Sequence, residues 1–134
     1  MKPKPCLHLE GLAVFALSLF LYWNMEFSWT LLLVLILAPD ISIIAYLFSS
    51  KFGAILYNLL HTYTFPLILV AAGIFFHYEL LITIALIWIM HIGVDRFLGF
   101  GLKYKTSFKD THLGRLWELV WIFLIKKLPY MSKI

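Results

Sequence analysis

Charged residues are scarce in this sequence. Asp, Glu, Lys and Arg make up 13% of its 134 residues, and 63% are hydrophobic, whereas soluble domains are about one quarter charged. The mean hydropathy of +0.92 leaves too few polar groups to cover a soluble surface. This composition excludes most soluble enzymes, nucleic-acid-binding modules and disordered tails, and the chain is too short for two domains. We therefore expect a small integral membrane protein, forming one domain over residues 1–134, with the lipid bilayer as its principal partner.

Cysteine is almost absent as well. Cys6 is the single cysteine, which excludes an intramolecular disulfide. The residues before Leu7 lack the small-residue cleavage site of a secretory signal peptide, so we expect the first apolar stretch to be retained as an anchor. There is neither an internal repeat nor a low-complexity segment.

Long apolar runs dominate what is present. Each of four runs is close to the roughly 20 residues that a helix needs to cross a hydrocarbon core of about 30 Å. The links between them are so short that neighbouring helices must run antiparallel. The sequence therefore predicts an all-α membrane protein, an antiparallel bundle of four transmembrane helices. The predicted spans are residues 7–23, 27–48, 52–76 and 80–98.

Basic residues are distributed very unevenly. Eight of the 11 Lys and Arg residues follow Asp95, and the other three are Lys2, Lys4 and Lys51. An antiparallel arrangement puts all of them on one side of the membrane, and the positive-inside rule makes that side cytoplasmic. We therefore predict a multi-pass protein of the bacterial cytoplasmic (inner) membrane with both termini in the cytoplasm, and no nucleic-acid partner.

The sequence changes character after the fourth run. Residues 99–110 form a glycine-containing polar loop, and Asp110 or Thr111 can cap the N-terminus of a helix. The following helix, residues 111–128, is amphipathic and its apolar part is too short to span the bilayer. We predict that it lies in the cytoplasmic interface. Its broad apolar face leaves room for a partner protein or a second copy of the chain, so homo-oligomerisation stays open.

Polar side chains interrupt the four apolar runs. A charged residue at the centre of a membrane helix costs roughly 2.5–3.5 kcal/mol on insertion scales, so such residues usually have a function. At 1.5 Å per residue, all of them fall in the cytoplasmic half of the membrane. They are Glu10 in the first run, Asp40 in the second, Asn58 and His61 in the third, and His91, Asp95 and Arg96 in the fourth.

Helical spacing brings several of these side chains together. His91 and Asp95 are four residues apart and share one face of a helix. Asp40 follows Pro39, which tends to kink a helix and expose its carbonyl groups. Carboxylates and imidazoles that converge in a helical bundle suit a divalent metal ion, zinc or manganese above all. The predicted metal ligands are Asp40, His61, His91 and Asp95.

Two families resemble this chain. The motifs Leu9-Glu10-Gly11, Ala38-Pro39-Asp40-Ile41-Ser42, Tyr57-Asn58-Leu59-Leu60-His61-Thr62-Tyr63, His91-Ile92-Gly93-Val94-Asp95-Arg96, Gly99-Phe100-Gly101-Leu102-Lys103-Tyr104 and Phe108-Lys109-Asp110-Thr111-His112-Leu113-Gly114 resemble those of the bacterial family called domain of unknown function 4260. That resemblance implies no particular activity. More distantly, the order Pro-Asp, His and His-x-x-x-Asp resembles the YdjM-type membrane-bound metal-dependent hydrolases, in which Asp40, His61, His91 and Asp95 match metal-ligand positions. The chain departs from that pattern at Glu10, where those proteins have His, and at Ser42, where they usually have a second acid.

The second resemblance implies a membrane-embedded, metal-dependent hydrolase of a phosphoester or lipid headgroup at the cytoplasmic side. Under that hypothesis Glu10 is a further ligand or general base, and Asn58 orients a ligand or the attacking water. His112 acts as a general acid. Arg96 and Lys103 bind a phosphate at the mouth of the site.

The residues leave other interpretations open. His61 and His91 could be axial ligands of a haem group, or the bundle could bind ions or lipid without catalysis. His61 alone could be a hydrogen-bonded core residue, and the pair formed by His91 and Asp95 could simply lock two helices together. Arg96 could neutralise a neighbouring carboxylate.

Overall fold

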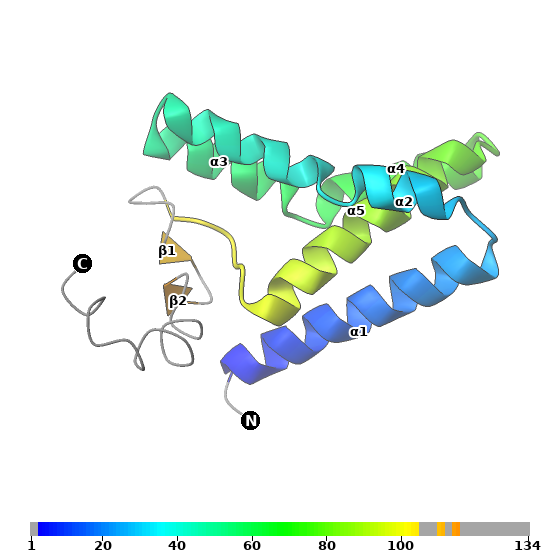
Figure 1. Ribbon diagram of the computed structural model, residues 1–134, viewed down its shortest axis with the longest axis horizontal. Coiled ribbons are helices and arrows are strands. Elements are labelled where there is room, and N and C mark those ends of the chain that lie inside the picture. The colour runs from blue at the N-terminus through cyan, green and yellow to red at the C-terminus, as the bar shows by residue number, and fades with distance from the viewer. Residues whose placement is uncertain (1–2, 105–109, 112–113, 116–134) are drawn as a thin grey trace.

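The computed structural model describes residues 3–104, 110–111 and 114–115. Helical segments make up nearly all of the described chain (Figure 1). In chain order the elements are α1 (Pro3–Asn24), α2 (Trp29–Leu35), the 3₁₀-helix η1 (Ala38–Leu47), α3 (Ser50–Leu60), α4 (Thr64–Phe75), α5 (Glu79–Leu98), and the two-residue strands β1 (Asp110–Thr111) and β2 (Gly114–Arg115).

Four helical stretches are long and apolar enough to cross a membrane. They cover Pro3–Asn24, Trp29–Leu47, Ser50–Phe75 and Glu79–Leu98, and each coincides within a few residues with one of the predicted spans. The first and last are single helices. The second consists of α2 followed by η1, and the third of α3 followed by α4, so these two stretches are interrupted where the sequence predicted continuous helices.

Proline accounts for both interruptions. α2 ends at Leu35, four residues before Pro39, because Pro39 has no N–H with which to bond back to the carbonyl of Leu35. The third stretch breaks between α3 and α4 for the same reason, since Pro66 cannot bond back to the carbonyl of Thr62. The first break follows from the kink that Pro39 predicted; the second was missed.

α5 is the central element, and α1, α2 and α4 all pack against it. α1 and α5 lie side by side (Figure 1). Their contact is close, because a Cβ atom on Gly93 would lie 2.9 Å from the backbone N of Phe15 and 3.0 Å from the carbonyl O of Gly11. Gly73 brings α4 close to α5, and Gly53 packs against the Tyr46 ring where α3 meets η1. The glycines thus let helices of one chain approach closely, as small residues do in membrane proteins.

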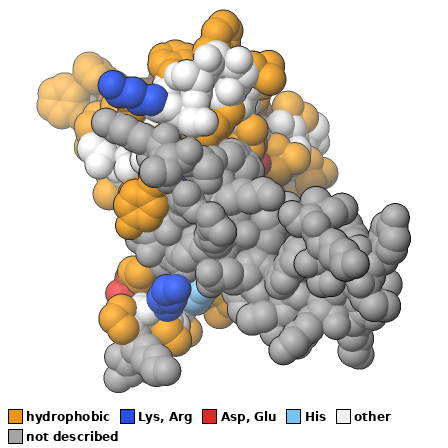
Figure 2. Space-filling view, turned by 90° about the vertical axis from the view of Figure 1, so that its left-hand side faces the viewer, with side chains coloured by type: hydrophobic (Ala, Val, Ile, Leu, Met, Phe, Trp, Pro, Cys, Tyr) orange, Lys and Arg blue, Asp and Glu red, His pale blue; other side chains and the backbone are white. Residues whose placement is uncertain are grey.

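The outer surface is largely apolar. Leu33, Leu47 and Phe48 are 76%, 85% and 81% exposed, whereas a compact hydrophobic cluster of Tyr22, Leu86 and other side chains lies between α1 and α5. Figure 2 shows hydrophobic side chains over much of the described surface at one end of the molecule, with Lys or Arg side chains in two places among them. Such a surface fits a lipid environment better than water.

α5 stops at a glycine. Gly99 has a φ of 93°, in the left-handed region that glycine adopts without strain, and the N–H of Phe100 bonds to the carbonyl of Asp95 at 2.8 Å. Beyond it, β1 and β2 pair antiparallel at residues where the sequence predicted the first turn of the interfacial helix. The remainder of that helix, residues 116–128, lies outside the described part of the chain.

Candidate metal centre

Three elements each supply part of a cluster of four side chains, here called the four-residue cluster: Asp40, His61, His91 and Asp95. Asp40 lies in the first turn of η1, directly after the proline that ends the previous helix. His61 directly follows α3 and caps its C-terminus, at the break in the third stretch. His91 and Asp95 share one face of α5, one helical turn apart. The structure therefore brings together all four of the predicted metal ligands.

The separations in the cluster fit a tetrahedral metal ion. His61 Nε2 lies 3.4 Å from Asp40 Oδ1 and 3.5 Å from Asp95 Oδ2, and His91 Nε2 lies 3.4 Å from each of these carboxylate oxygens. The two Nε2 atoms are 3.2 Å apart, and all four donor atoms lie within 4.8 Å of one another. A regular tetrahedron of ligands about 2.1 Å from zinc has edges of about 3.4 Å.

The tautomer of His61 is suited to metal binding. Its Nδ1 lies 2.9 Å from the carbonyl oxygen of Tyr57, an acceptor, so Nδ1 carries the hydrogen and Nε2 presents its lone pair to the cluster. Histidines that bind metals are commonly oriented by such a bond on the other ring nitrogen. The Tyr57 ring also stacks on the His61 ring, with centroids 3.7 Å apart and planes 10° apart, which fixes the plane of the imidazole.

A positive charge is required at the centre of the cluster. Five of the six separations between the donor atoms are 3.2–3.5 Å, and acceptor atoms this close repel unless a proton or a cation lies between them. The two imidazole rings are almost fully buried and the side chain of Asp95 is 14% exposed, so water screens this repulsion poorly. One divalent cation would neutralise both carboxylates and satisfy all four donors at once.

The break in the third stretch is stabilised by donors from α5. Where a helix ends in a buried region, its last carbonyls need partners. The indole Nε1 of Trp88 donates to the carbonyl of Leu60 at 2.6 Å, and Arg96 Nη2 donates to the carbonyl of His61 at 2.8 Å. Arg96 Nη1 donates to the carbonyl of Phe100 at 2.9 Å. Arg96 therefore contacts the main chain of a predicted metal ligand.

Asn58 connects α3 to the segment that follows α5. Its Nδ2 donates to the carbonyl of Lys103 at 2.7 Å, and its Oδ1 accepts from the backbone N–H of Lys103 at 2.6 Å. The side chain of Lys103 is buried and its Nζ lies 4.4 Å from the centroid of the Tyr57 ring. Burial lowers the pKa of Lys103 to about 8, and the negative charges of Asp95 and Asp40 act in the opposite direction.

The remaining predicted site residues are placed differently. Glu10 is on an exposed part of α1 and does not belong to the four-residue cluster. His112 lies outside the described residues. Two residues near the cluster were missed by sequence reasoning: Tyr57 and Trp88. Tyr57 precedes His61 by four residues, a spacing that indicates contact in a helix, and an indole N–H within an apolar run usually requires a partner.

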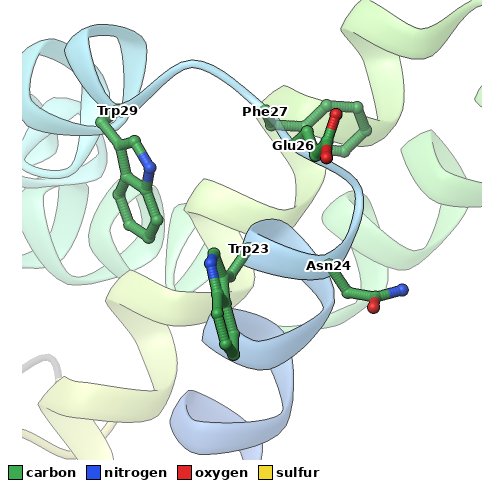
Figure 3. Close-up of a pocket in the computed structure, with 5 residues that line it drawn as sticks. All are labelled: Trp23, Asn24, Glu26, Phe27 and Trp29. Carbon is green, nitrogen blue, oxygen red and sulfur yellow. The ribbon is translucent and has the colours of Figure 1, made fainter.

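A separate hollow lies where α1 connects to α2. It has a volume of about 450 Å³ and is lined by Trp23, Asn24, Glu26, Phe27 and Trp29, whose side chains are drawn in Figure 3. None of these residues belongs to the four-residue cluster. Aromatic side chains of this kind are typical of membrane–water interfaces.

These features define a class: a small helical protein with four helices able to span a membrane and a His₂Asp₂ group able to hold a metal ion. Residues 4–116 match the model of the family described as domain of unknown function (DUF4260), and the chain belongs to that family. No curated protein and no solved structure matches the chain.

Proposed function

We propose that this protein is a membrane-embedded, metal-dependent hydrolase that acts on a phosphoester or a lipid headgroup at the cytoplasmic side. Its four long helices cross the bacterial inner membrane in antiparallel order, with both termini in the cytoplasm and residues 111–128 associated with the interface. Asp40, His61, His91 and Asp95 hold one divalent ion. The observation that carries the proposal is the convergence of their four donor atoms, with five of the six separations at 3.2–3.5 Å and all within 4.8 Å.

Zinc fits this donor set best. Two imidazoles and two carboxylates make a ligand set of intermediate softness, and the separations match its tetrahedral geometry. The formal charges of one divalent ion and two carboxylates sum to zero, which limits the cost of burying the group in a medium of low dielectric constant. Manganese remains an alternative, because it also accepts carboxylate and imidazole ligands, but it prefers more of them.

Hydrolysis requires a free coordination position. Four protein ligands complete a tetrahedral zinc site, so a water molecule or substrate must either add as a fifth ligand or displace one of the four. Asp40 would provide this position, because its side chain is 37% exposed whereas the other three are 14% exposed or less. A divalent ion there would polarise a phosphoryl or carbonyl oxygen and acidify a bound water. The resemblance to the YdjM-type hydrolases supports this choice of chemistry.

The haem alternative is disfavoured by the same geometry. In a bis-histidine haem the flat macrocycle passes between the two ligating nitrogens. His61 Nε2 and His91 Nε2 are 3.2 Å apart, and carboxylate oxygens lie within 3.5 Å of both. A porphyrin ring cannot enter this space unless the helices separate.

Two predicted roles change in this proposal. Asn58 and Arg96 bind main-chain groups, so we assign them to positioning the site and not to contact with water or phosphate. Glu10 and His112 stay candidates for proton transfer, and Lys103 stays a candidate for attracting an anionic group to the site.

The test is a metal analysis on protein purified in detergent without a metal-binding tag. We expect about one zinc per chain, loss of that zinc on dialysis against a chelator, and rebinding on titration. Asp95→Asn and His91→Ala should each remove most of the bound zinc.

His77→Asn is the matched control for the histidine variant. His77 is exposed and has a φ of 52°, a conformation that asparagine tolerates, so this variant should retain zinc. Full zinc occupancy in both Asp95→Asn and His91→Ala would refute the ligand assignment. A strong Soret absorption band in the purified protein would support haem in its place.

A further inference from the structure

Access to the four-residue cluster is uneven. Three of its side chains are 1%, 3% and 14% exposed, whereas that of Asp40 is 37% exposed. Anything that reaches the cluster from outside therefore has to come past Asp40. The polarity of the side chains around Asp40 therefore determines which class of molecule can reach the cluster.

The side of the cluster nearest the end of α5 is closed. The Tyr57 ring covers His61, the ammonium group of Lys103 lies over the Tyr57 ring, and both residues are buried. The two hydrogen bonds between Asn58 and the backbone of Lys103, with the bond from Arg96 to the carbonyl of Phe100, hold this cover in place. A dissolved molecule therefore has no route past these residues.

The surface around Asp40 is apolar. Side chains three residues apart lie one above another in a 3₁₀-helix, so Ile43 flanks Asp40, and Leu37, the N-cap residue of η1, precedes Asp40 by the same three positions. Leu37 is 66% exposed and Ile43 is 37% exposed. The neighbouring row, Ile41, Ile44 and Leu47, is exposed as well, at 66%, 57% and 85%. The exposed carboxylate is thus surrounded by side chains suited to acyl chains.

We propose that the cluster opens laterally, between the apolar side chains beside Asp40, and that its substrate is a membrane-resident amphiphile whose polar group reaches the metal from within the bilayer. This inference rests on the proposed function and narrows its substrate class to lipids, excluding dissolved phosphoesters. Asp40 lies seven residues before the end of η1, about 14 Å at the rise of a 3₁₀-helix. The reacting bond therefore lies below the headgroup layer and not at the water surface.

The opening can be tested without knowing the substrate. A carboxylic acid adds its O–H across a C=N bond of a carbodiimide, and the adduct rearranges to a stable N-acylurea that mass spectrometry detects. In metal-free protein in nanodiscs, we expect dicyclohexylcarbodiimide, which partitions into lipid, to label Asp40 at least tenfold more than a water-soluble carbodiimide does. Glu79, the exposed first residue of α5, should show the opposite preference. Zinc should protect Asp40 from both reagents.

The outcomes separate the two proposals. Preferential labelling of Asp40 by the water-soluble reagent, or no labelling by either, would overturn the lateral opening. Lipid-phase labelling that zinc does not reduce would support the opening but overturn the metal assignment, and with it the proposed function.

The substrate class has its own test with dodecyl phosphate and inorganic phosphate as probes. In cobalt-loaded protein, either anion that binds the metal changes the visible absorption spectrum. We expect dodecyl phosphate to bind at least tenfold more tightly, since two buried CH₂ groups already supply about that factor. Equal affinity for both anions would overturn the proposal.

A pair of variants distinguishes binding at the opening from simple partitioning of dodecyl phosphate into the detergent micelle. Leu37→Trp places a bulky side chain beside Asp40 and should weaken dodecyl phosphate binding several-fold. Leu47→Trp makes the same change in the neighbouring row and should leave binding unchanged. Equal effects of the two variants would contradict an opening beside Asp40.

Discussion

Replacing Arg96 tests how the break in the third stretch supports the metal centre. Its guanidinium group donates to the carbonyl of His61 at 2.8 Å and to the carbonyl of Phe100 at 2.9 Å. Arg96→Gln removes the charge and shortens the side chain, so neither carbonyl keeps a well-placed donor. Arg96→Lys retains a charge but reaches only one of the two carbonyls, and it serves as the matched comparison.

The expected magnitude follows from these two contacts. A hydrogen bond to a charged group contributes about 1.5–3 kcal/mol, and a buried carbonyl without a partner adds a penalty in an apolar environment. Allowing for partial rebonding by Gln, we expect the free energy of unfolding of Arg96→Gln to fall by about 2–4 kcal/mol. Loss of hydrogen bonds that orient the ligands of a metal site weakens metal affinity about 10- to 100-fold. Arg96→Lys should show roughly half the loss of stability.

Two measurements on detergent-purified protein check this. Equilibrium unfolding of the metal-free protein gives the change in stability, and zinc titration against a competing chelator gives the change in affinity. The reasoning is refuted if Arg96→Gln keeps both its stability and its zinc affinity. If that variant instead lost only turnover of a phosphate-containing substrate, and Arg96→Lys restored it, Arg96 would act on the substrate as the sequence first suggested.

Three further predictions follow from other contacts. Gly93→Ala should destabilise the contact between α1 and α5 by about 1–3 kcal/mol, because the new methyl group meets backbone atoms at 2.9 and 3.0 Å that no change of rotamer can move; thermal unfolding against wild type checks this, and an unchanged midpoint would contradict the close approach. Asn58→Leu should release the segment at Lys103, so that trypsin cleaves after that residue many times faster in the folded protein; equal cleavage rates would show that the two hydrogen bonds do not hold it. Stability should rise between pH 8 and 10.5, because burial lowers the pKa of Lys103 to about 8 from an ordinary 10.5 and the unfolded state therefore binds more protons in this interval; Lys103→Met should lack this rise, and an identical pH profile in both proteins would refute the assignment.

The predictions from sequence were most accurate where composition and spacing decide the outcome. Four apolar runs of about 20 residues gave the four helices, because only a helix satisfies every backbone group within an apolar segment of that length. Likewise, the spacing of four between His91 and Asp95 placed both on one face of α5. The cluster itself was predicted from depth, since residues at a similar distance from the same side of a membrane lie at one level of a bundle.

Other features could not be predicted from local sequence. The third stretch was expected to be continuous, but Pro66 breaks it, and His61 caps the C-terminus of α3 at that break. The hydrogen bonds of Arg96 to main-chain carbonyls were not predicted either, since the sequence suggested that Arg96 binds a phosphate or neutralises a carboxylate. Those carbonyls belong to residues up to 35 positions away, beyond the reach of any local pattern.

The amino-acid sequence alone determined that the chain is helical, apolar and equipped with two carboxylates and two imidazoles at one depth, because hydropathy and helical periodicity are local properties. Tertiary structure alone decided which of the polar residues meet, that Glu10 lies outside the cluster, and that Asp40 is its exposed member. These depend on how each helix is rotated about its own axis, and that rotation is set by contacts such as Gly11 against Gly93, which arise only when distant parts of the chain pack together.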